Sequence, residues 1–193
     1  YGVKSISMDD IASQLGISKK TIYQYYSNKA ELVNAVSESF FKADKEKSRE
    51  IIRRSENAVH ELVLFLKQAQ VSLQSISNNA ILEIRKYYPN AWTCFEDYTK
   101  GFVIDCVRDN LQRGVKEGYY RPNLQIEIVT RLRVAQFETA LRQDIFPIPE
   151  FDPLQVQTEI MDLYFHGITT PKGKALLDEY LQQEPGIKNL APK

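Results

Sequence analysis

Apolar residues recur every three to four positions along most of the chain, and strict alternation of polar and apolar residues is rare. Residues 7–10 place a serine three positions before an acidic residue, the capping-box spacing that opens a helix. Ile11, Ala12 and Leu15 then form one apolar face, and Gly16 is suited to end the helix. The pattern predicts a short first helix.

Two further helix starts follow directly. Ser18 is placed to cap a second short helix that extends to about Tyr26. Asn28, followed three residues later by an acid, opens a third helix with apolar residues at helical spacing. This helix is expected to continue through the charged stretch 42–54, whose charges either are simply solvated or mark a rigid connector.

The helical period persists beyond residue 57, and its breaks fall at glycine, proline and asparagine. Residues 184–193 show no such pattern and are expected to form a loose tail. The sequence contains no repeat and no low-complexity tract. The fold class is therefore predicted to be all-α, with further helices at about 58–76, 79–88, 90–117, 124–143, 153–168 and 171–183.

The composition of this 193-residue chain is that of a globular protein able to bury a core, with 43% hydrophobic and 26% charged residues. Its 25 basic and 25 acidic residues cancel, so a case for nucleic-acid binding must come from a motif. The longest apolar run covers residues 62–66, far short of the roughly 18 residues of a membrane span. The chain opens on a polar helical pattern instead of a signal peptide, so the cytoplasm is the expected location.

Residues with catalytic or metal-binding chemistry do not cluster in the sequence. Cys94 and Cys106 lie about 18 Å apart in one expected helix, whereas a disulfide needs Cα atoms within about 7 Å, so they are interpreted as reduced core thiols. His60 and His166 have no partner at metal-ligand spacing. Glycine-rich phosphate loops, HExxH, GxSxG and CxxC motifs are absent from the sequence. We therefore expect no enzyme, no cofactor and no bound metal.

Residues 15–18 join the first two expected helices with the spacing of a helix-turn-helix. Gly16 permits the positive φ that a tight turn needs, and Ile17 is placed to tuck between the helices. The second helix is unusually rich in polar and aromatic side chains, and its first residues would meet base edges in a major groove. Taken by themselves, Lys19 and Lys20 would more commonly be a solvated pair.

The motif extends into a longer signature. The segments SISMDDIA, LGISK, TIY, YY and NKAEL, spread over residues 5–32, resemble the TetR (tetracycline-repressor-like) family in order and spacing. Residues 115–122 also resemble, much less distinctively, the linker before the dimerising helices of this family. The resemblance implies a helix-turn-helix domain at residues 1–45 and a helical ligand-sensing and dimerisation domain at residues 46–193. A further helix normally precedes Tyr1 in this family, so the first domain is expected to be incomplete here.

The resemblance also assigns roles to individual residues of the first domain. Lys19 and Lys20 occupy positions where the family reads bases, and lysine can donate to guanine O6 and N7. Lys29 matches a phosphate-binding lysine at the next helix start, helped by free backbone N–H groups. The residues expected to contact DNA are Ser7, Ser18, Lys19, Lys20, Thr21, Tyr23, Tyr25 and Lys29. The expected core of the domain is Ile11, Ala12, Leu15, Ile17, Ile22, Tyr26 and Leu32.

Aromatic residues gather on one face of the long helix expected at residues 90–117. Plain core packing is one interpretation of this face. The alternative is a ligand cavity between this helix and its neighbours, since aromatic-lined interhelical cavities are common binding sites. The second interpretation surrounds a mostly apolar small molecule with Phe65, Ala69, Leu73, Ile84, Tyr88, Trp92, Phe95 and Phe102.

Apolar positions on the helices expected at residues 124–143 and 153–168 fit an intersubunit four-helix interface, as the resemblance implies. These positions are Val129, Leu132, Ala135, Phe137 and Ala140, with Ile160, Leu163, Tyr164 and Gly167.

The resulting hypothesis is a homodimeric, ligand-responsive transcriptional regulator, in this family usually a repressor that a small molecule releases from its operator. Its partners would be a double-stranded DNA operator, palindromic to match the dimer, and an unknown, mostly apolar effector, with no membrane. A second hypothesis is a helical small-molecule carrier with a non-functional helix-turn-helix. An α-helical enzyme is disfavoured, because the sequence shows no acid–base or nucleophile constellation.

Overall fold

The computed structural model describes residues 2–75, 78–140, 142–147 and 149–183, without the side chains of residues 73–75 and 78–79. This part of the chain contains no strand, only an isolated bridge between Tyr120 and Thr169, so the all-α prediction is confirmed. In chain order the elements are α1 (Met8–Leu15), α2 (Lys19–Tyr23), α3 (Lys29–Arg54), α4 (Ala58–Ser75), α5 (Asn78–Tyr87), α6 (Pro89–Tyr98), η1 (Thr99–Val103), α7 (Ile104–Lys116), α8 (Ile126–Ala140), α9 (Pro153–Ile168) and α10 (Pro171–Gln183).

Most helices begin and end close to where the apolar period predicts. α2 is shorter than expected, because it ends at Tyr23 and residues 24–26 form turns before the next cap at Asn28. The long helix expected at 90–117 is continuous, but it contains η1, a single π-helical turn. The expected tail at 184–193 lies outside the described residues.

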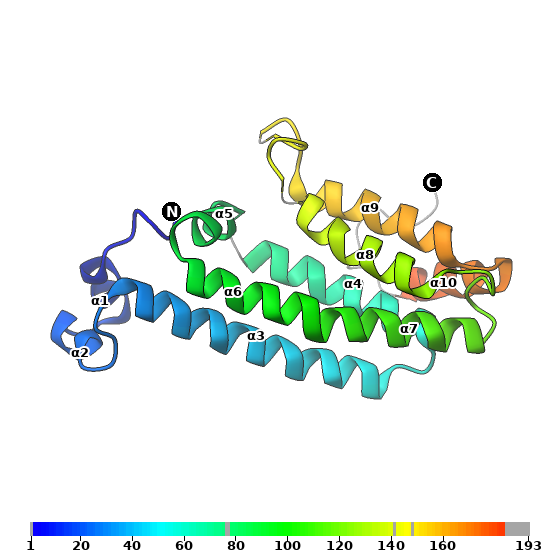
Figure 1. Cartoon of the computed structure of the whole chain (residues 1–193), viewed down its shortest axis with the longest axis horizontal. Coiled ribbons are helices and arrows are strands. Elements are labelled where there is room, and N and C mark those ends of the chain that lie inside the picture. Colours follow the sequence, from blue (N-terminus) through cyan, green and yellow to red (C-terminus); the bar gives the residue numbers. More distant parts are fainter. Residues whose placement is uncertain (1, 76–77, 141, 148, 184–193) are drawn as a thin grey trace.

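α3 runs along the length of the molecule, with the short helices α1 and α2 at its start (Figure 1). The rod formed by α6, η1 and α7 lies alongside α3, and α4 packs against both. α8 and α9 form an antiparallel pair that contacts α7, while α10 lies at the end remote from α1. Within the described ranges, none of the helices combines the length and the hydropathy that crossing a bilayer requires.

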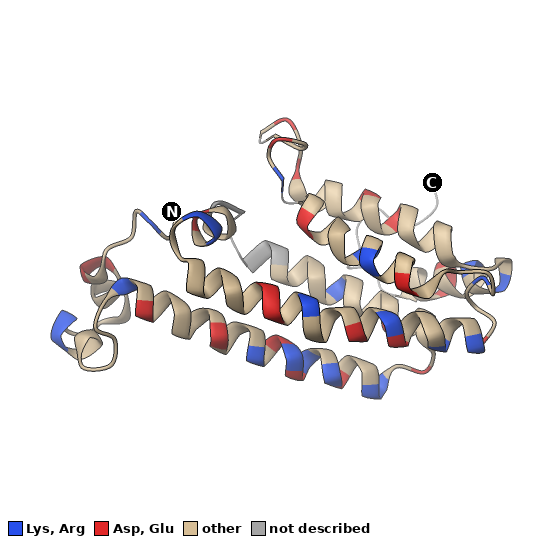
Figure 2. Cartoon of the chain, viewed as in Figure 1, with Lys and Arg blue, Asp and Glu red and all other residues tan. Residues whose placement is uncertain are grey.

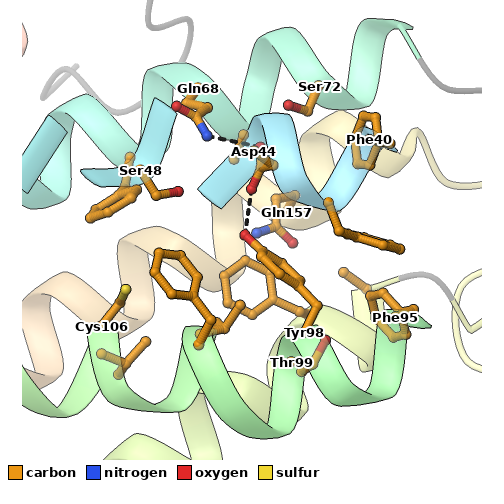
Figure 3. Close-up of a pocket in the computed structure, with 18 of the residues that line it drawn as sticks. Phe40, Asp44, Ser48, Gln68, Ser72, Phe95, Tyr98, Thr99, Cys106 and Gln157 are labelled. Atoms are coloured by element: carbon orange, nitrogen blue, oxygen red, sulfur yellow. Dashed lines mark hydrogen bonds between the residues drawn. The ribbon is translucent and has the colours of Figure 1, made fainter. Parts of the chain in front are cut away.

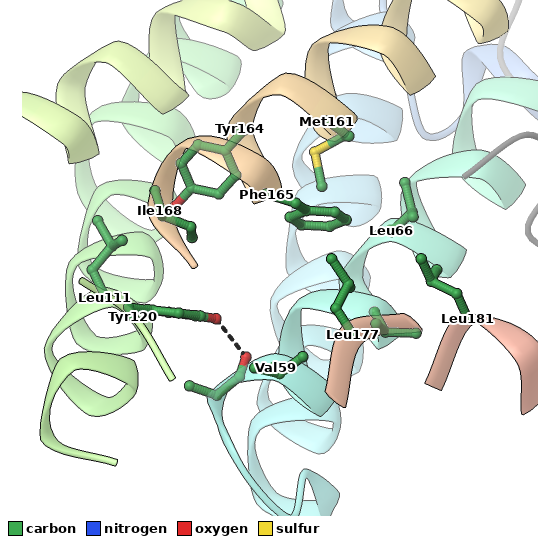
Figure 4. Packing of buried hydrophobic residues seen from close by; sticks show 12 residues of the cluster. Val59, Leu66, Leu111, Tyr120, Met161, Tyr164, Phe165, Ile168, Leu177 and Leu181 are labelled. Atoms are coloured by element: carbon green, nitrogen blue, oxygen red, sulfur yellow. Dashed lines mark hydrogen bonds between the residues drawn. The ribbon is translucent and has the colours of Figure 1, made fainter. Parts of the chain in front are cut away.

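The main hydrophobic core lies where α4, α7, α9 and α10 meet (Figure 4). Tyr120, on the segment after α7, inserts its ring into this core. Its hydroxyl donates to the Ala58 carbonyl oxygen at 2.9 Å and lies 3.1 Å from the side-chain oxygen of Asn110. The Asn110 amide donates to the same carbonyl at 3.0 Å. Because buried polar groups destabilise a core unless they are paired, this network fixes the start of α4 against α7.

A partly buried ion cluster holds the end of α3 against α4 and α7. The Arg113 guanidinium lies 3.1 Å from the Glu61 carboxylate and 2.8 Å from that of Glu117. It also donates at 3.2 Å to the backbone carbonyl of Ser55, the residue that ends α3. Burial raises the pKa of Glu61, while hydrogen bonds from Asn110 and Arg113 act in the opposite direction. Loss of the guanidinium would leave a buried carboxylate unpaired, so the cluster is an anchor for α3.

Gly114 on α7 provides the space for the Tyr120 ring, because an added Cβ would lie 2.0 Å from that ring. An ordinary change from glycine to alanine inside a helix gains about 1 kcal/mol of helix propensity. Here we expect Gly114→Ala to lower the free energy of unfolding by about 1–3 kcal/mol instead, since the buried ring has no room to move aside. Urea unfolding followed by circular dichroism measures the difference.

Gly101 in η1 is the matched control, because a Cβ there would meet no atom within 4 Å. Gly101→Ala should leave the free energy of unfolding unchanged or raise it slightly. A Gly114→Ala protein as stable as the wild type would show that the Tyr120 ring is not tightly held.

Candidate functional site

Side-chain caps and a glycine shape the turn between α1 and α2. The Ser7 hydroxyl oxygen accepts the Asp10 backbone N–H at 3.1 Å, and the Asp10 carboxylate accepts the Ser7 backbone N–H at 2.8 Å. The Ser7 hydroxyl proton is itself donated to this carboxylate at 2.6 Å. Gly16 ends α1 with φ +66°, as its position predicts. The Ser18 hydroxyl then caps α2 by accepting the Thr21 N–H at 3.1 Å.

A small core holds α1, α2 and the start of α3 together. The prediction that Leu15 and Ile17 belong to it is wrong, since these side chains are 64% and 42% exposed. Both residues lie next to Gly16 in the turn. α1 has only eight residues and α2 only five, so the surface that the two helices bury between them does not extend to these side chains. The buried members are Met8, Ala12 and Ile22, with Ile11, Tyr26 and Leu32 packed against them.

α2 lies at the tip of the molecule remote from α10 (Figure 1), and basic residues are coloured on its ribbon (Figure 2). Lys20, Tyr23 and Tyr25 are exposed. The Lys19 ammonium is also exposed and pairs with Asp9 at 2.6 Å. Water screens such an exposed pair and it contributes little to stability, so both lysines are available to a partner.

Lys29, at the start of α3, is half-buried and binds the chain itself. Its ammonium donates to the backbone carbonyl of Lys4 at 3.2 Å and to that of Ile6. These bonds hold the segment before α1 against α3. An ammonium carries three N–H donors, so this role leaves one donor for a phosphate.

The segment before α1 also contacts α5, although the two are far apart in the sequence. The Lys4 backbone N–H donates to the Glu83 carboxylate at 2.6 Å. The Lys4 ammonium lies 4.4 Å from the centre of the Tyr87 ring, within range of a cation–π contact. Sequence reasoning missed this contact, because no local pattern marks a pairing between residues so distant. It ties the helix-turn-helix end to a helix of the bundle.

A cavity of about 470 Å³ lies inside the helical bundle, and every helix from α3 to α9 contributes to its wall (Figure 3). Its volume falls within the range of about 300–1,000 Å³ that is usual for small-molecule sites. Of the two interpretations of the aromatic face, the structure thus supports a cavity over plain core packing. The residues expected around a ligand that line it are Phe65, Ala69, Ile84, Trp92, Phe95 and Phe102.

Tyr88 and Leu73 of that expected set are not among the described residues that line the cavity. Tyr88 does not line the cavity; it precedes Pro89 and forms the N-cap of α6 with φ −130° and ψ 70°, outside the helical register. The side chain of Leu73 lies outside the described residues. Cys106, expected to be a core thiol, lines the cavity. Burial raises its pKa to about 12, so it is a protonated thiol near neutral pH.

α3 supplies a wall of the cavity, although the charged residues 42–54 of its second half were expected to be solvated or to form a rigid connector. Phe41 stacks on Tyr98 with ring centres 5.0 Å apart. Asp44 accepts hydrogen bonds from the Tyr98 hydroxyl and from the Gln68 amide, the latter at 2.9 Å (Figure 3). Burial, and then the Asp44 carboxylate, raise the pKa of Tyr98. The adjacent aromatics Phe40 and Phe41 were the available signal that this helix has a second apolar face.

The apolar positions of α8 and α9 divide between the inside and the outside of the molecule. Phe137, Ala140 and Tyr164 line the cavity, contrary to the expectation that they face a second subunit. Residues three or four apart share a helix face, so positions between them point outward. The exposed positions of the expected interface are Leu132, Ala135, Leu163 and Gly167, and Ile128 joins them.

Known proteins resemble the chain in its sequence. Residues 1–36 match the family of bacterial regulatory proteins named tetR. Over 171 residues the chain is 26% identical to YvaF, an uncharacterized HTH-type transcriptional regulator of Bacillus subtilis (strain 168), with 86% of each protein covered. Over 138 residues it is 24% identical to the HTH-type transcriptional repressor KstR2 of Mycobacterium tuberculosis, covering 67% of this chain and 66% of the repressor.

Solved structures share its fold. The structure of KstR2 from Mycobacterium tuberculosis matches with a TM-score of 0.60 at 21% identity, over 87% of each chain. The structure of FadR from Bacillus subtilis in complex with stearoyl-CoA matches with a TM-score of 0.62 at 17% identity, over 86% of this chain and 91% of that one. Together with the geometry of α1 and α2, the match over residues 1–36 and the similarity to YvaF and KstR2 support a DNA-binding transcriptional regulator of the tetR type.

Proposed function

We propose that the chain is a homodimeric repressor that binds operator DNA through α2 and leaves it when a mostly apolar small molecule fills the cavity. The cavity carries this proposal, because its wall includes α3, the helix that begins beside α2. Apolar effectors have support among the relatives. KstR2 is described as a ketosteroid transcriptional regulator, and the FadR structure contains stearoyl-CoA.

Two helices connect the cavity to the DNA-binding end. α3 lines the cavity with Phe40 and Phe41, and its 26 residues span about 39 Å. α5 lines it with Ile84, while the neighbouring Glu83 holds the backbone of Lys4 before α1. A ligand that displaces either helix would move α2. In a dimer, the two copies of α2, which would enter the major groove, would then lose the spacing of about 34 Å that one turn of DNA requires.

Glu83→Ala is expected to uncouple the cavity from DNA without changing the affinity for effector, because Glu83 holds Lys4 and does not line the cavity. In the wild type an effector should lower operator affinity about 5- to 150-fold, and this factor should shrink in the variant. Trp92 fluorescence reports effector binding, with stearoyl-CoA as the first probe, and fluorescence anisotropy of a labelled operator reports DNA binding.

Lys86→Ala is the control for that experiment, since Lys86 is exposed on the same helix and makes no contact with Lys4 among the described interactions. It should retain the full coupling factor. If Glu83→Ala also retains it, α3 alone carries the signal.

The lysines at the helix-turn-helix are expected to contact different parts of the DNA, namely base edges for Lys19 and Lys20 and a phosphate for Lys29. Lys19→Ala or Lys20→Ala should lower operator affinity by about 1–3 kcal/mol and relax sequence preference, if these side chains donate to base edges. Lys29→Ala should weaken binding to all duplexes similarly and make the salt dependence shallower. Because Lys29 also holds two backbone carbonyls, its loss should lower thermal stability as well.

The measurement uses the full-length protein and an operator selected from random duplexes, with anisotropy recorded on operator variants over a range of salt concentrations. Identical behaviour of the two classes of lysine would refute the division into base and phosphate contacts. A protein that binds apolar ligands but shows no salt-dependent DNA binding would instead be the carrier of the alternative hypothesis.

A homodimer is part of the proposal, because a single recognition helix reads only a few base pairs. The exposed apolar face of α8 and α9 includes Leu132, which is 59% exposed, and Leu163, which is 70% exposed. Two copies related by a two-fold axis would bury these residues in a four-helix bundle.

Leu163→Glu is expected to convert the dimer into a monomer, since the two-fold axis would bury an unpaired carboxylate from each subunit. Light scattering at micromolar concentration should give twice the 22.3 kDa of the chain for the wild type and the chain mass for the variant. Val71→Glu also replaces an exposed apolar residue with a carboxylate, but on α4, and should leave the dimer intact. A wild-type protein that is monomeric under these conditions would exclude the dimer.

A further inference from the structure

Arg133 is a buried cation that meets no counter-charge among the described residues. Its side chain lies on the inner face of α8 and is only 4% exposed. The guanidinium lies 4.0 Å from the centre of the Phe137 ring and 5.2 Å from that of Tyr164, and its Nη2 donates to the Met161 sulfur. Its Nη1 has no hydrogen-bond partner, and no carboxylate among the described residues pairs with the group.

Such an arrangement destabilises the folded protein, because aromatic rings and a thioether replace the hydration of a cation only in part. Burial lowers the pKa of Arg133 to about 10, while Tyr164 acts in the opposite direction, so the group stays charged at neutral pH. The same fold gives Arg113, which is more exposed, two carboxylates, those of Glu61 and Glu117. Arg133 therefore differs from an arginine that serves as a structural ion pair.

Arg133 is one of the residues that line the cavity, and the wall consists mainly of aromatic and aliphatic side chains. Asp44 also lines the wall, and its carboxylate already accepts hydrogen bonds from the Tyr98 hydroxyl and the Gln68 amide. Gln157, also 4% exposed, lines the wall from α9. Among its described residues, the cavity thus combines a mostly apolar wall with the unpaired positive charge of Arg133.

We infer that Arg133 binds an anionic group of the effector, which is therefore an amphipathic organic anion with an apolar or aromatic body. The inference rests on the proposed ligand-binding function and adds the chemical class of the ligand. A carboxylate, sulfonate or phosphate group accepts from the free Nη1–H, and the planar guanidinium can hold two oxygens at once. The walls of low dielectric strengthen this ion pair. The body of the ligand packs on rings such as Phe41, Phe95 and Phe102.

Two fluorescent probes that differ by one group test the inference, namely anilinonaphthalene sulfonate and its uncharged parent, N-phenylnaphthylamine. Both brighten when they enter an apolar cavity. The wild-type protein should bind the sulfonate more tightly, and Arg133→Met should lower the sulfonate affinity about 10- to 100-fold while leaving the parent unaffected. Arg131→Met removes an exposed arginine two residues away and should change neither affinity.

Thermal unfolding without probe separates this effect from a folding defect. Replacing a buried, uncompensated charge with an apolar chain of similar length should leave the melting temperature unchanged or raise it. If Arg133→Met does not fold, Arg133→Lys and Arg133→Gln take its place. The lysine variant should keep a preference for the sulfonate, and the glutamine variant should lose it.

Aliphatic competitors extend the test to carboxylates. Dodecanoate should displace bound N-phenylnaphthylamine from the wild type at lower concentrations than from Arg133→Met, whereas dodecanol should displace it equally from both. The inference that Arg133 binds an anion would be overturned if dodecanoate displaced the probe equally from the wild type and Arg133→Met, or if Arg133→Met kept the wild-type affinity for the sulfonate. Neither result would contradict the proposal that the cavity binds ligands. Failure of both probes to bind the wild type would refute the ligand cavity and the proposed function with it.

Discussion

α3 is one uninterrupted helix that is fixed at both ends, and this constraint governs the rest of the structure. At its start, Lys29 holds the backbone before α1, so the helix-turn-helix is tied to the first turn of α3. At its end, Arg113 binds the Ser55 carbonyl and joins it to α4 and α7. Between these anchors, α3 forms a wall of the cavity. Because a packed helix moves as a rigid element, α3 is the route by which, in the proposed function, the contents of the cavity act on the position of α2.

Features that depend on a few neighbouring residues were predictable from the sequence. The caps at Ser7, Ser18 and Asn28 were predicted from residue type and spacing, and the left-handed turn from Gly16 alone. The helical period identified the remaining helices for the same reason, since each buries one face. The π turn at Thr99–Val103 was not predictable, because it is a local change in hydrogen bonding that leaves the apolar period almost intact.

Residues of the candidate site were likewise predictable only where they depend on neighbours in the sequence. Trp92, Phe95 and Phe102 were predictable as a group because they share one helix face. Contacts between distant segments were not, as the bond from Lys4 to Glu83 shows. Arg133 shows most clearly what the sequence could not predict. When an arginine and a leucine are neighbours on a helix, the arginine ordinarily faces solvent and the leucine faces the core. Here the neighbouring leucine is exposed and the arginine is buried, an inversion that only the packing of α8 on α7 and α9 decides.

The helical bundle is closely packed at the α10 end and hollow nearer the helix-turn-helix, and this difference determines which helices can respond to a ligand. Where α4, α7, α9 and α10 meet, the core is closely packed, and the buried Tyr120 hydroxyl and Asn110 amide are paired with the Ala58 carbonyl, so this end of the molecule has little freedom to rearrange. The hollow lies between that end and the helix-turn-helix, and it carries an unpaired cation on its wall. Both features lower the stability of the free protein, and a ligand that binds only the folded state recovers part of that loss. Since the packed end resists movement, the proposed function assigns the response to filling to the elements that border the cavity and continue toward the helix-turn-helix, which are α3 and α5.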